Sequence, residues 1–133
     1  MTPELYWLTW AVAFSALLWI PYVANRFREL GPPSWTKWFL PPDPPHRAEW
    51  ANRSAKAHVN AVENLVVFAP LAIVASIQGG TAATALACQA FFFARLAHAI
   101  VQTSGMPIPF RTVPFLVGFA CQLTLAVSIL SRA

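Results

Sequence analysis

The chain has 133 residues, of which 57% are hydrophobic and only 11% are charged, whereas charged residues make up about 25% of an ordinary soluble domain. A mean hydropathy of +0.52 and a formal net charge of +4 indicate one compact membrane-protein unit. Nucleic acid is a poor partner, because no continuous basic and aromatic surface lies outside the apolar stretches. Cys88 and Cys121 lie in apolar runs without metal-type spacing, so we expect buried thiols and neither a disulfide nor a metal site.

Four apolar stretches are each long enough to cross a bilayer as a helix. They predict an all-α membrane protein, a four-transmembrane-helix bundle in a single domain over residues 1–133, with helices at about 4–27, 50–77, 81–103 and 112–131. The first stretch, Leu5–Val23, is uncharged and lacks the preceding basic segment of a cleaved signal peptide. We therefore expect a retained helix, with Pro21 bending its last turn.

Proline and tryptophan dominate the connection between the first two helices. Gly31–Pro45 holds six prolines in 15 residues, a composition that predicts a stiff, extended segment without regular helix. Trp35, Trp38 and Trp50 lie along this connection. They favour a position on the lipid headgroups over that of a plain linker.

The later helices have recognisable ends. The second starts between Ala48 and Asn52 and ends before the glycine-containing turn at residues 78–80, which is short enough to require an antiparallel hairpin. Thr81 is the expected N-cap of the third helix. A break over residues 104–110 separates the third helix from the fourth.

Basic residues are distributed unevenly about the four spans. Those at or near the first and third connections are Arg26, Arg28, Lys37, Arg47, Arg53, Lys56 and Arg111, whereas Arg132 lies at the far end of the chain. The positive-inside rule then predicts that both termini lie outside and that the two basic connections face the cytoplasm.

Polar residues recur at steps of three and four on the second and third helices, which puts each set on one helical face. These sets are Arg53, Lys56, Asn60 and Glu63 on the second helix, and Arg95, His98 and Gln102 on the third. Ionisable side chains inside an apolar span are costly and usually face a bundle interior or a wet cavity. From Lys56 to Glu63 the set rises about 10 Å at the helical rise of roughly 1.5 Å per residue, enough to hold both ends of a small peptide or another zwitterion.

Structural ion pairs that join helices are the alternative explanation for these residues. The two polar faces, Arg26 at the end of the first helix and Arg111 at the head of the fourth are all expected at the same membrane face. Scattered structural pairs have no reason to share a leaflet, so this convergence favours a binding site. His46 and His58 lie off the polar face and are expected to be bystanders.

Three motifs resemble the MAPEG family, the membrane-associated proteins of eicosanoid and glutathione metabolism. The second helix reads R-x-x-K-A-x-x-N-x-x-E-N from Arg53, the third contains ARLAHA from Ala94, and the fourth opens with P-x-P-x-R-T from Pro107. The resemblance covers nearly the whole chain. It implies a four-helix bundle that assembles as a homotrimer and binds glutathione between subunits, toward the cytoplasmic side.

The resemblance also implies roles for individual residues. Asn60 and Glu63 match the residues that hold the glutathione backbone, and Arg111 matches the arginine assigned to the thiol. Further binding positions are Arg26, which reaches the neighbour's site, with Arg53, Lys56, Arg95, His98 and Gln102. Lys56 keeps the charge of an arginine without its bidentate fork. His98 and Gln102 stand where the leukotriene synthase type has tyrosines.

A guanidinium suits this chemistry because it stabilises a thiolate and lowers the pKa of a thiol from about 8.5. The leading hypothesis is therefore a glutathione-dependent transferase or peroxidase that acts on lipophilic electrophiles from the bilayer. The alternative is a non-catalytic protein of the same fold that binds a lipid or a partner, favoured by Lys56 and Gln102. A membrane scaffold whose charges hold a trimer together is the third. The electrophile, and the choice between glutathione and another thiol, stay open at this point.

Overall fold

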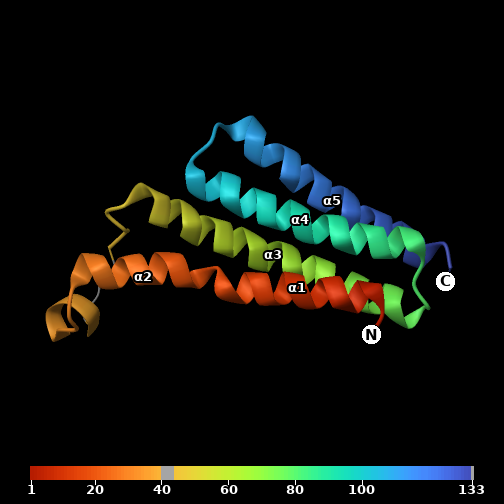
Figure 1. Cartoon of the computed structure of the whole chain (residues 1–133), viewed down its shortest axis with the longest axis horizontal. Helices are drawn as coiled ribbons and strands as arrows, with labels where there is room; N and C mark the ends of the chain where they lie inside the picture. The colour runs from red at the N-terminus through yellow and green to blue at the C-terminus, as the bar shows by residue number, and fades with distance from the viewer. Residues whose placement is uncertain (40–43, 133) are drawn as a thin grey trace.

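The computed structural model describes residues 1–39 and 44–132, and every element within them is a helix (Figure 1). The helices are α1 (Pro3–Leu17), α2 (Trp19–Leu30), α3 (Glu49–Ile77), α4 (Ala82–Ser104) and α5 (Ile108–Leu130), with a short π-helical turn η1 (Trp35–Phe39). Four spans are long and apolar enough to cross a membrane, namely Pro3–Leu30, Glu49–Ile77, Ala82–Ser104 and Ile108–Leu130. The predicted all-α protein with four transmembrane helices is confirmed.

The first span is interrupted between α1 and α2. Pro21 has no N–H, so the carbonyl of Leu17 lacks the donor that a continuous α-helix would supply four residues later. The Leu18 N–H turns back to Ser15 O instead, at 3.3 Å. The interruption therefore falls one turn before the proline, and the helix then continues to Gly31, whose φ of 70° ends it.

The proline-rich connection contains one helical turn that the composition did not predict. The turn η1 lies in a proline-free stretch, where Ser34 O accepts from the backbone N–H groups of Lys37 at 3.2 Å and Trp38 at 2.9 Å. The Trp38 ring packs on Phe27 with ring centroids 4.7 Å apart. The extended conformation expected for the second half of the connection falls largely on residues 40–43, which lie outside the described residues.

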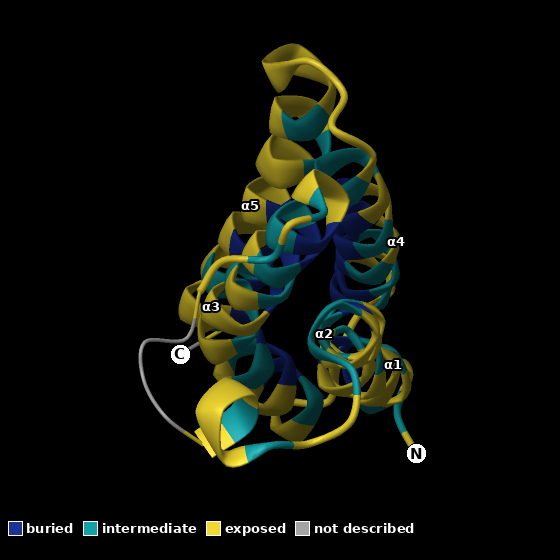
Figure 2. Ribbon diagram, turned by 90° about the vertical axis from the view of Figure 1, so that its left-hand side faces the viewer, coloured by how far each residue is buried: buried dark blue, intermediate teal, exposed yellow. Residues whose placement is uncertain are grey.

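The helices form an elongated bundle with the start of α1 and the end of α5 at one end, and residues 31–39, 44–48 and 105–107 at the other (Figure 1). Helix α4 contacts α1, α3 and α5. Buried residues lie between the helices, while the outer faces of the bundle are exposed (Figure 2). Exposed large apolar residues such as Val66, Ile77 and Val127 lie on these outer faces, as expected where lipid is the solvent.

Small side chains let the helices approach closely in the core. Ala11, Ala72 and Ala75 are almost completely buried, and small residues at helix interfaces are typical of membrane bundles. Phe68 of α3 and Phe91 of α4 stack nearly in parallel, with ring centroids 3.7 Å apart. This apolar core holds α3 and α4 together. The same two helices bear the polar residues near the connections at the other end of the bundle.

A buried carboxylate closes the bundle at the end that holds the termini. Glu4 is only 2% exposed, and it accepts a hydrogen bond from Thr84 Oγ1 at 2.7 Å. Thr81 caps α4 as expected, accepting from the Thr84 N–H at 3.1 Å. A Cβ at Gly80 would lie 2.5 Å from Glu4 Oε1, so a larger residue at this turn position would displace the carboxylate. Sequence reasoning missed this contact because Glu4 lies just before the uncharged run Leu5–Val23 and has no polar partner near it in the sequence.

Candidate functional site

A polar pocket of about 290 Å³ opens between α3, α4 and α5 at the end of the bundle that carries the connections. Its lining residues are Lys56, Asn60, His98, Gln102, Arg111, Thr112 and Phe115. Five of the residues singled out in the sequence therefore meet in one pocket, namely Lys56, Asn60, His98, Gln102 and Arg111.

Helical spacing accounts for most of this convergence. Lys56 and Asn60 lie one turn apart on α3, and His98 and Gln102 lie one turn apart on α4. Residues three or four apart share a face, so each helix contributes a pair of side chains to the same cavity. The antiparallel α3–α4 arrangement then sets the two pairs side by side.

Arg111 reaches the pocket because α5 begins earlier than the sequence indicated. The helix starts at Ile108 rather than at 112, since Pro107 supplies the extended N-cap backbone and Pro109 is tolerated in the first turn. Arg111 is thus inside the helix, not before it. Its Nη1 donates to Gln102 Oε1 at 3.2 Å, which fixes the guanidinium against α4.

Thr112 and Phe115 are pocket residues that sequence reasoning missed. Both follow from the earlier start of α5, because Thr112 is adjacent to Arg111 and Phe115 is one helical turn beyond it. The signal that would have identified them is the position of Pro107, which marks the N-cap of α5.

The charged side chains that line the pocket are all cationic. Lys56 and Arg111 contribute two cations, and among the residues that the structure describes no aspartate or glutamate lines the cavity. Within residues 1–39 and 44–132, Lys56 forms no hydrogen bond or ion pair with the protein. An anion or a group rich in acceptors is therefore the ligand that this pocket favours.

Arg95 lies behind the pocket and does not line it. The side chain is 4% exposed, and its Nη1 donates to Asn60 Oδ1 at 3.2 Å. Its Nη2 donates to the carbonyl oxygens of Pro114 at 3.1 Å and Phe115 at 3.4 Å. Arg95 thus joins α3, α4 and α5 immediately beneath the cavity.

Three other predicted site residues lie apart from the pocket in the single chain. Arg53 donates from Nε to Thr103 O at 3.1 Å, a contact that ties the start of α3 to the end of α4. Glu63 is exposed on α3, two helical turns from Lys56, and it has no hydrogen-bond or ion-pair partner among the described residues. Arg26 belongs to a separate polar network.

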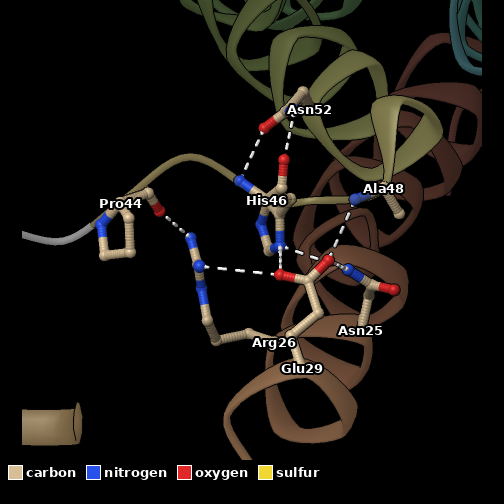
Figure 3. A network of polar contacts seen from close by, with 7 residues as sticks. All are labelled: Asn25, Arg26, Glu29, Pro44, His46, Ala48 and Asn52. Carbon is tan, nitrogen blue, oxygen red and sulfur yellow. Dashed lines mark hydrogen bonds and ion pairs between the residues drawn. The ribbon is translucent and has the colours of Figure 1, made fainter.

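That network, which we call the Glu29 network, is centred on the Glu29 carboxylate (Figure 3). Glu29 Oε1 accepts from Asn25 Nδ2 at 2.6 Å and from the Ala48 N–H at 3.0 Å. Its Oε2 lies 3.8 Å from Arg26 Nη1 and 3.7 Å from His46 Nδ1. The end of α2 is thereby joined to the residues that precede α3.

Two further contacts hold the same connection (Figure 3). His46 and Asn52 form a reciprocal pair, with His46 N donating to Asn52 Oδ1 at 2.9 Å and Asn52 Nδ2 donating to His46 O at 2.8 Å. Arg26 Nη2 donates to Pro44 O at 2.6 Å.

His58 is also outside the pocket, where its Nδ1 lies 3.0 Å from the Tyr22 hydroxyl.

The fold and the site together define a multi-pass integral membrane protein with a cationic pocket among three of its spans. The model of the MAPEG family matches residues 5–131, and the chain belongs to that family, as its motifs predicted.

Microsomal glutathione S-transferase 1 is similar to this chain in several mammals. The Rattus norvegicus protein is 34% identical over 83 residues, which cover 62% of this chain and 54% of the relative. The Homo sapiens protein is 33% identical over 79 residues, covering 59% of this chain and 51% of the relative. The match thus spans about half the length of these curated relatives. Membership of the family and these relatives support a function related to glutathione.

Proposed function

We propose that the protein is a glutathione-dependent transferase or peroxidase that acts on lipophilic electrophiles at the membrane. The observation that carries this proposal is the position of Arg111, whose guanidinium lines a cationic pocket and is fixed by Gln102. The names of the relatives support glutathione as the co-substrate. Arg111 is the catalytic residue of this proposal.

The proposed chemistry is stabilisation of a thiolate. A thiol with a pKa of about 8.5 is mostly protonated at neutral pH and is then a weak nucleophile. A guanidinium within hydrogen-bond reach favours the anion and lowers that pKa. Arginine keeps its charge when it is partly desolvated, so Arg111 can supply this field at the membrane interface.

The peptide part of glutathione is proposed to extend along α3. Lys56 and Asn60 bind an acidic end in the pocket, while Glu63, two helical turns from Lys56, accepts the ammonium. The pocket's volume of about 290 Å³ is close to the lower limit of roughly 300 Å³ for small-molecule sites. A homotrimer, in which Arg26 of a neighbouring copy approaches this face, would complete the enclosure.

The electrophile is proposed to enter from lipid. An apolar crevice of about 520 Å³ lies between α4 and α5, and its lining includes Phe110, next to Arg111 in the sequence, and Pro114, three residues after it. A lipophilic molecule dissolved in the bilayer reaches such a crevice without crossing water.

The pocket is proposed to face the cytoplasm, with both chain ends outside, because basic residues concentrate at the pocket's end of the bundle. Reporter fusions at both termini check this orientation. A cytoplasmic signal from either terminus contradicts it.

A non-catalytic lipid- or partner-binding protein is the second candidate. Gln102 favours it, because an amide that accepts from Arg111 engages part of the guanidinium and supplies no phenol. Purified protein in detergent separates the two candidates. The proposal expects glutathione binding, a thiolate absorbance near neutral pH and conjugation of an apolar electrophile. Binding without a thiolate signal overturns the catalytic role.

A further inference from the structure

Arg95 is a buried cation held by neutral groups. Its partners are Asn60 Oδ1, Pro114 O and Phe115 O, and within the described residues no carboxylate pairs with it. Its Nε is buried without a hydrogen-bond partner among those residues. Burial of a charge without a counter-ion is costly, so its position demands an account beyond helix packing.

Two aromatic rings and a glycine surround the Arg95 guanidinium. The Phe91 and Phe115 rings have centroids 5.6 Å and 5.7 Å from its Cζ. On the third side, a Cβ at Gly118 would lie 2.5 Å from Nη2 and 3.0 Å from Cζ. An alanine at this buried position of α5 would therefore require the guanidinium to shift from the place where it meets the helix backbone.

This contact decides which way the Asn60 amide faces. A guanidinium has donors and no acceptor, so the atom that meets Arg95 Nη1 has to be the amide oxygen. The NH₂ group of the amide then faces away from Arg95. Asn60 lines the pocket and Arg95 does not, so the polar group that Asn60 offers to a ligand is a pair of N–H donors.

We infer that Arg95, seated on Gly118, is a positioning residue that turns the Asn60 amide into a donor for a carboxylate or carbonyl oxygen of the ligand. This inference rests on the proposed function of the pocket. With Lys56, one turn away, these two N–H donors form a binding position for an acidic group of the ligand on the α3 side of the pocket. The amine of the ligand is thereby directed away from this position.

Asn60→Asp tests the amide orientation directly. The carboxylate keeps the shape, pairs with Arg95 and removes both donors. We expect thermal stability in detergent to be kept or raised while affinity for glutathione falls about tenfold or more, as expected for loss of hydrogen bonds to a charged ligand group. Unchanged or higher affinity would mean that the oxygen faces the ligand, and it would overturn the inference.

A double-mutant cycle tests the positioning role. Arg95→Lys and Gly118→Ala each disturb the guanidinium in a different way, and each is measured with Asn60 present and in an Asn60→Ala background. We expect either change to lower glutathione affinity about threefold to tenfold with Asn60 present, and to have no further effect once Asn60 is alanine. An equal loss in both backgrounds would assign Arg95 to structure alone.

Two features of this experiment separate its possible failures. If the wild-type protein binds no glutathione, the proposed function fails and the inference fails with it. If the wild-type protein binds glutathione and the cycle is additive, only the inference fails. Thermal unfolding of each variant identifies one that does not fold, and the second of the two Arg95 perturbations then decides the outcome.

Discussion

Two polar clusters, the Glu29 network and the pocket, lie at the same end of the bundle. They differ in whether their hydrogen-bond donors have partners within the protein. In the Glu29 network, Asn25, the Ala48 N–H and the Asn52 amide all meet acceptors in the chain (Figure 3). In the pocket, Lys56 has no partner among the described residues, and the NH₂ group of Asn60 forms no hydrogen bond with them. A saturated cluster stabilises the fold, whereas spare donors lining a cavity indicate a place for a ligand.

Arg111→Leu should give the largest effect on the pocket side of this comparison. Loss of a preorganised cation next to a developing charge lowers turnover by about a hundredfold or more. Glutathione affinity should stay nearly unchanged, because the peptide ends are held elsewhere. Steady-state kinetics and the absorbance of bound thiolate measure the two properties.

The matched control for this change is Arg28→Leu, which removes an exposed cation from α2 at the same end of the bundle. It should leave both turnover and thiolate absorbance unchanged. Arg111→Lys should recover part of each, since a point charge lacks the directional fork of arginine. Equal turnover in Arg111→Leu and the wild type would remove Arg111 from the chemistry.

Glu63→Gln should give the next largest effect. The change keeps the shape of the side chain and removes the charge that we expect to meet a ligand ammonium, an interaction typically worth about 1.5–3 kcal/mol. Calorimetry should show glutathione affinity falling about tenfold, with the proposed oligomer intact by size-exclusion chromatography. Dissociation of the oligomer would instead identify Glu63 as a structural residue.

Asn52→Ala should have the opposite profile, because this residue belongs to the saturated cluster. It breaks the reciprocal pair with the His46 backbone, which should reduce the free energy of unfolding by about 1–3 kcal/mol. Affinity for glutathione should change by less than about twofold. Comparison with Asn60→Ala, two turns along the same helix, is the sharpest form of this test, and a large affinity loss in Asn52→Ala would contradict the distinction.

Lys56→Arg should give the smallest change, and it is a gain. Both side chains are cationic, but the planar fork of arginine can bind a carboxylate through two parallel hydrogen bonds. We expect glutathione affinity to rise about twofold to fivefold. A fall in affinity would show that the pocket has no room for a fork at this position.

Helix periodicity and hydropathy were sufficient to predict the membrane spans and part of the pocket lining. The four spans follow from length and composition, and the pairs Lys56–Asn60 and His98–Gln102 follow from spacing along single helices. A helical wheel gives the direction of a side chain but not the rotation of one helix against another. In the single chain, Arg95 therefore lies behind the pocket rather than in its lining. Arg53 contacts Thr103 O instead of the pocket, and the binding roles predicted for both residues stay predictions.

Local backbone details account for the rest of the difference. The start of α5 depends on the extended conformation of Pro107, and this start brings Thr112 and Phe115 to the pocket. The break before Pro21 similarly depends on a hydrogen bond that proline cannot make. Features of this kind involve one or two residues, so they leave little trace in a periodicity computed over a whole helix.

The buried hydrogen bond between Glu4 and Thr84 also bears on how the helices assemble during synthesis of the chain. Glu4 lies 80 residues before Thr84 in the chain, so it leaves the ribosome well before the third span, which supplies the hydroxyl that donates to it. Its carboxylate therefore stays without this partner until the α3–α4 hairpin has entered the membrane. Docking of α1 should be a late step of biogenesis, and in a nascent chain that ends before Thr84 a cysteine introduced into α1 should react with crosslinkers that the same variant of the longer chain resists.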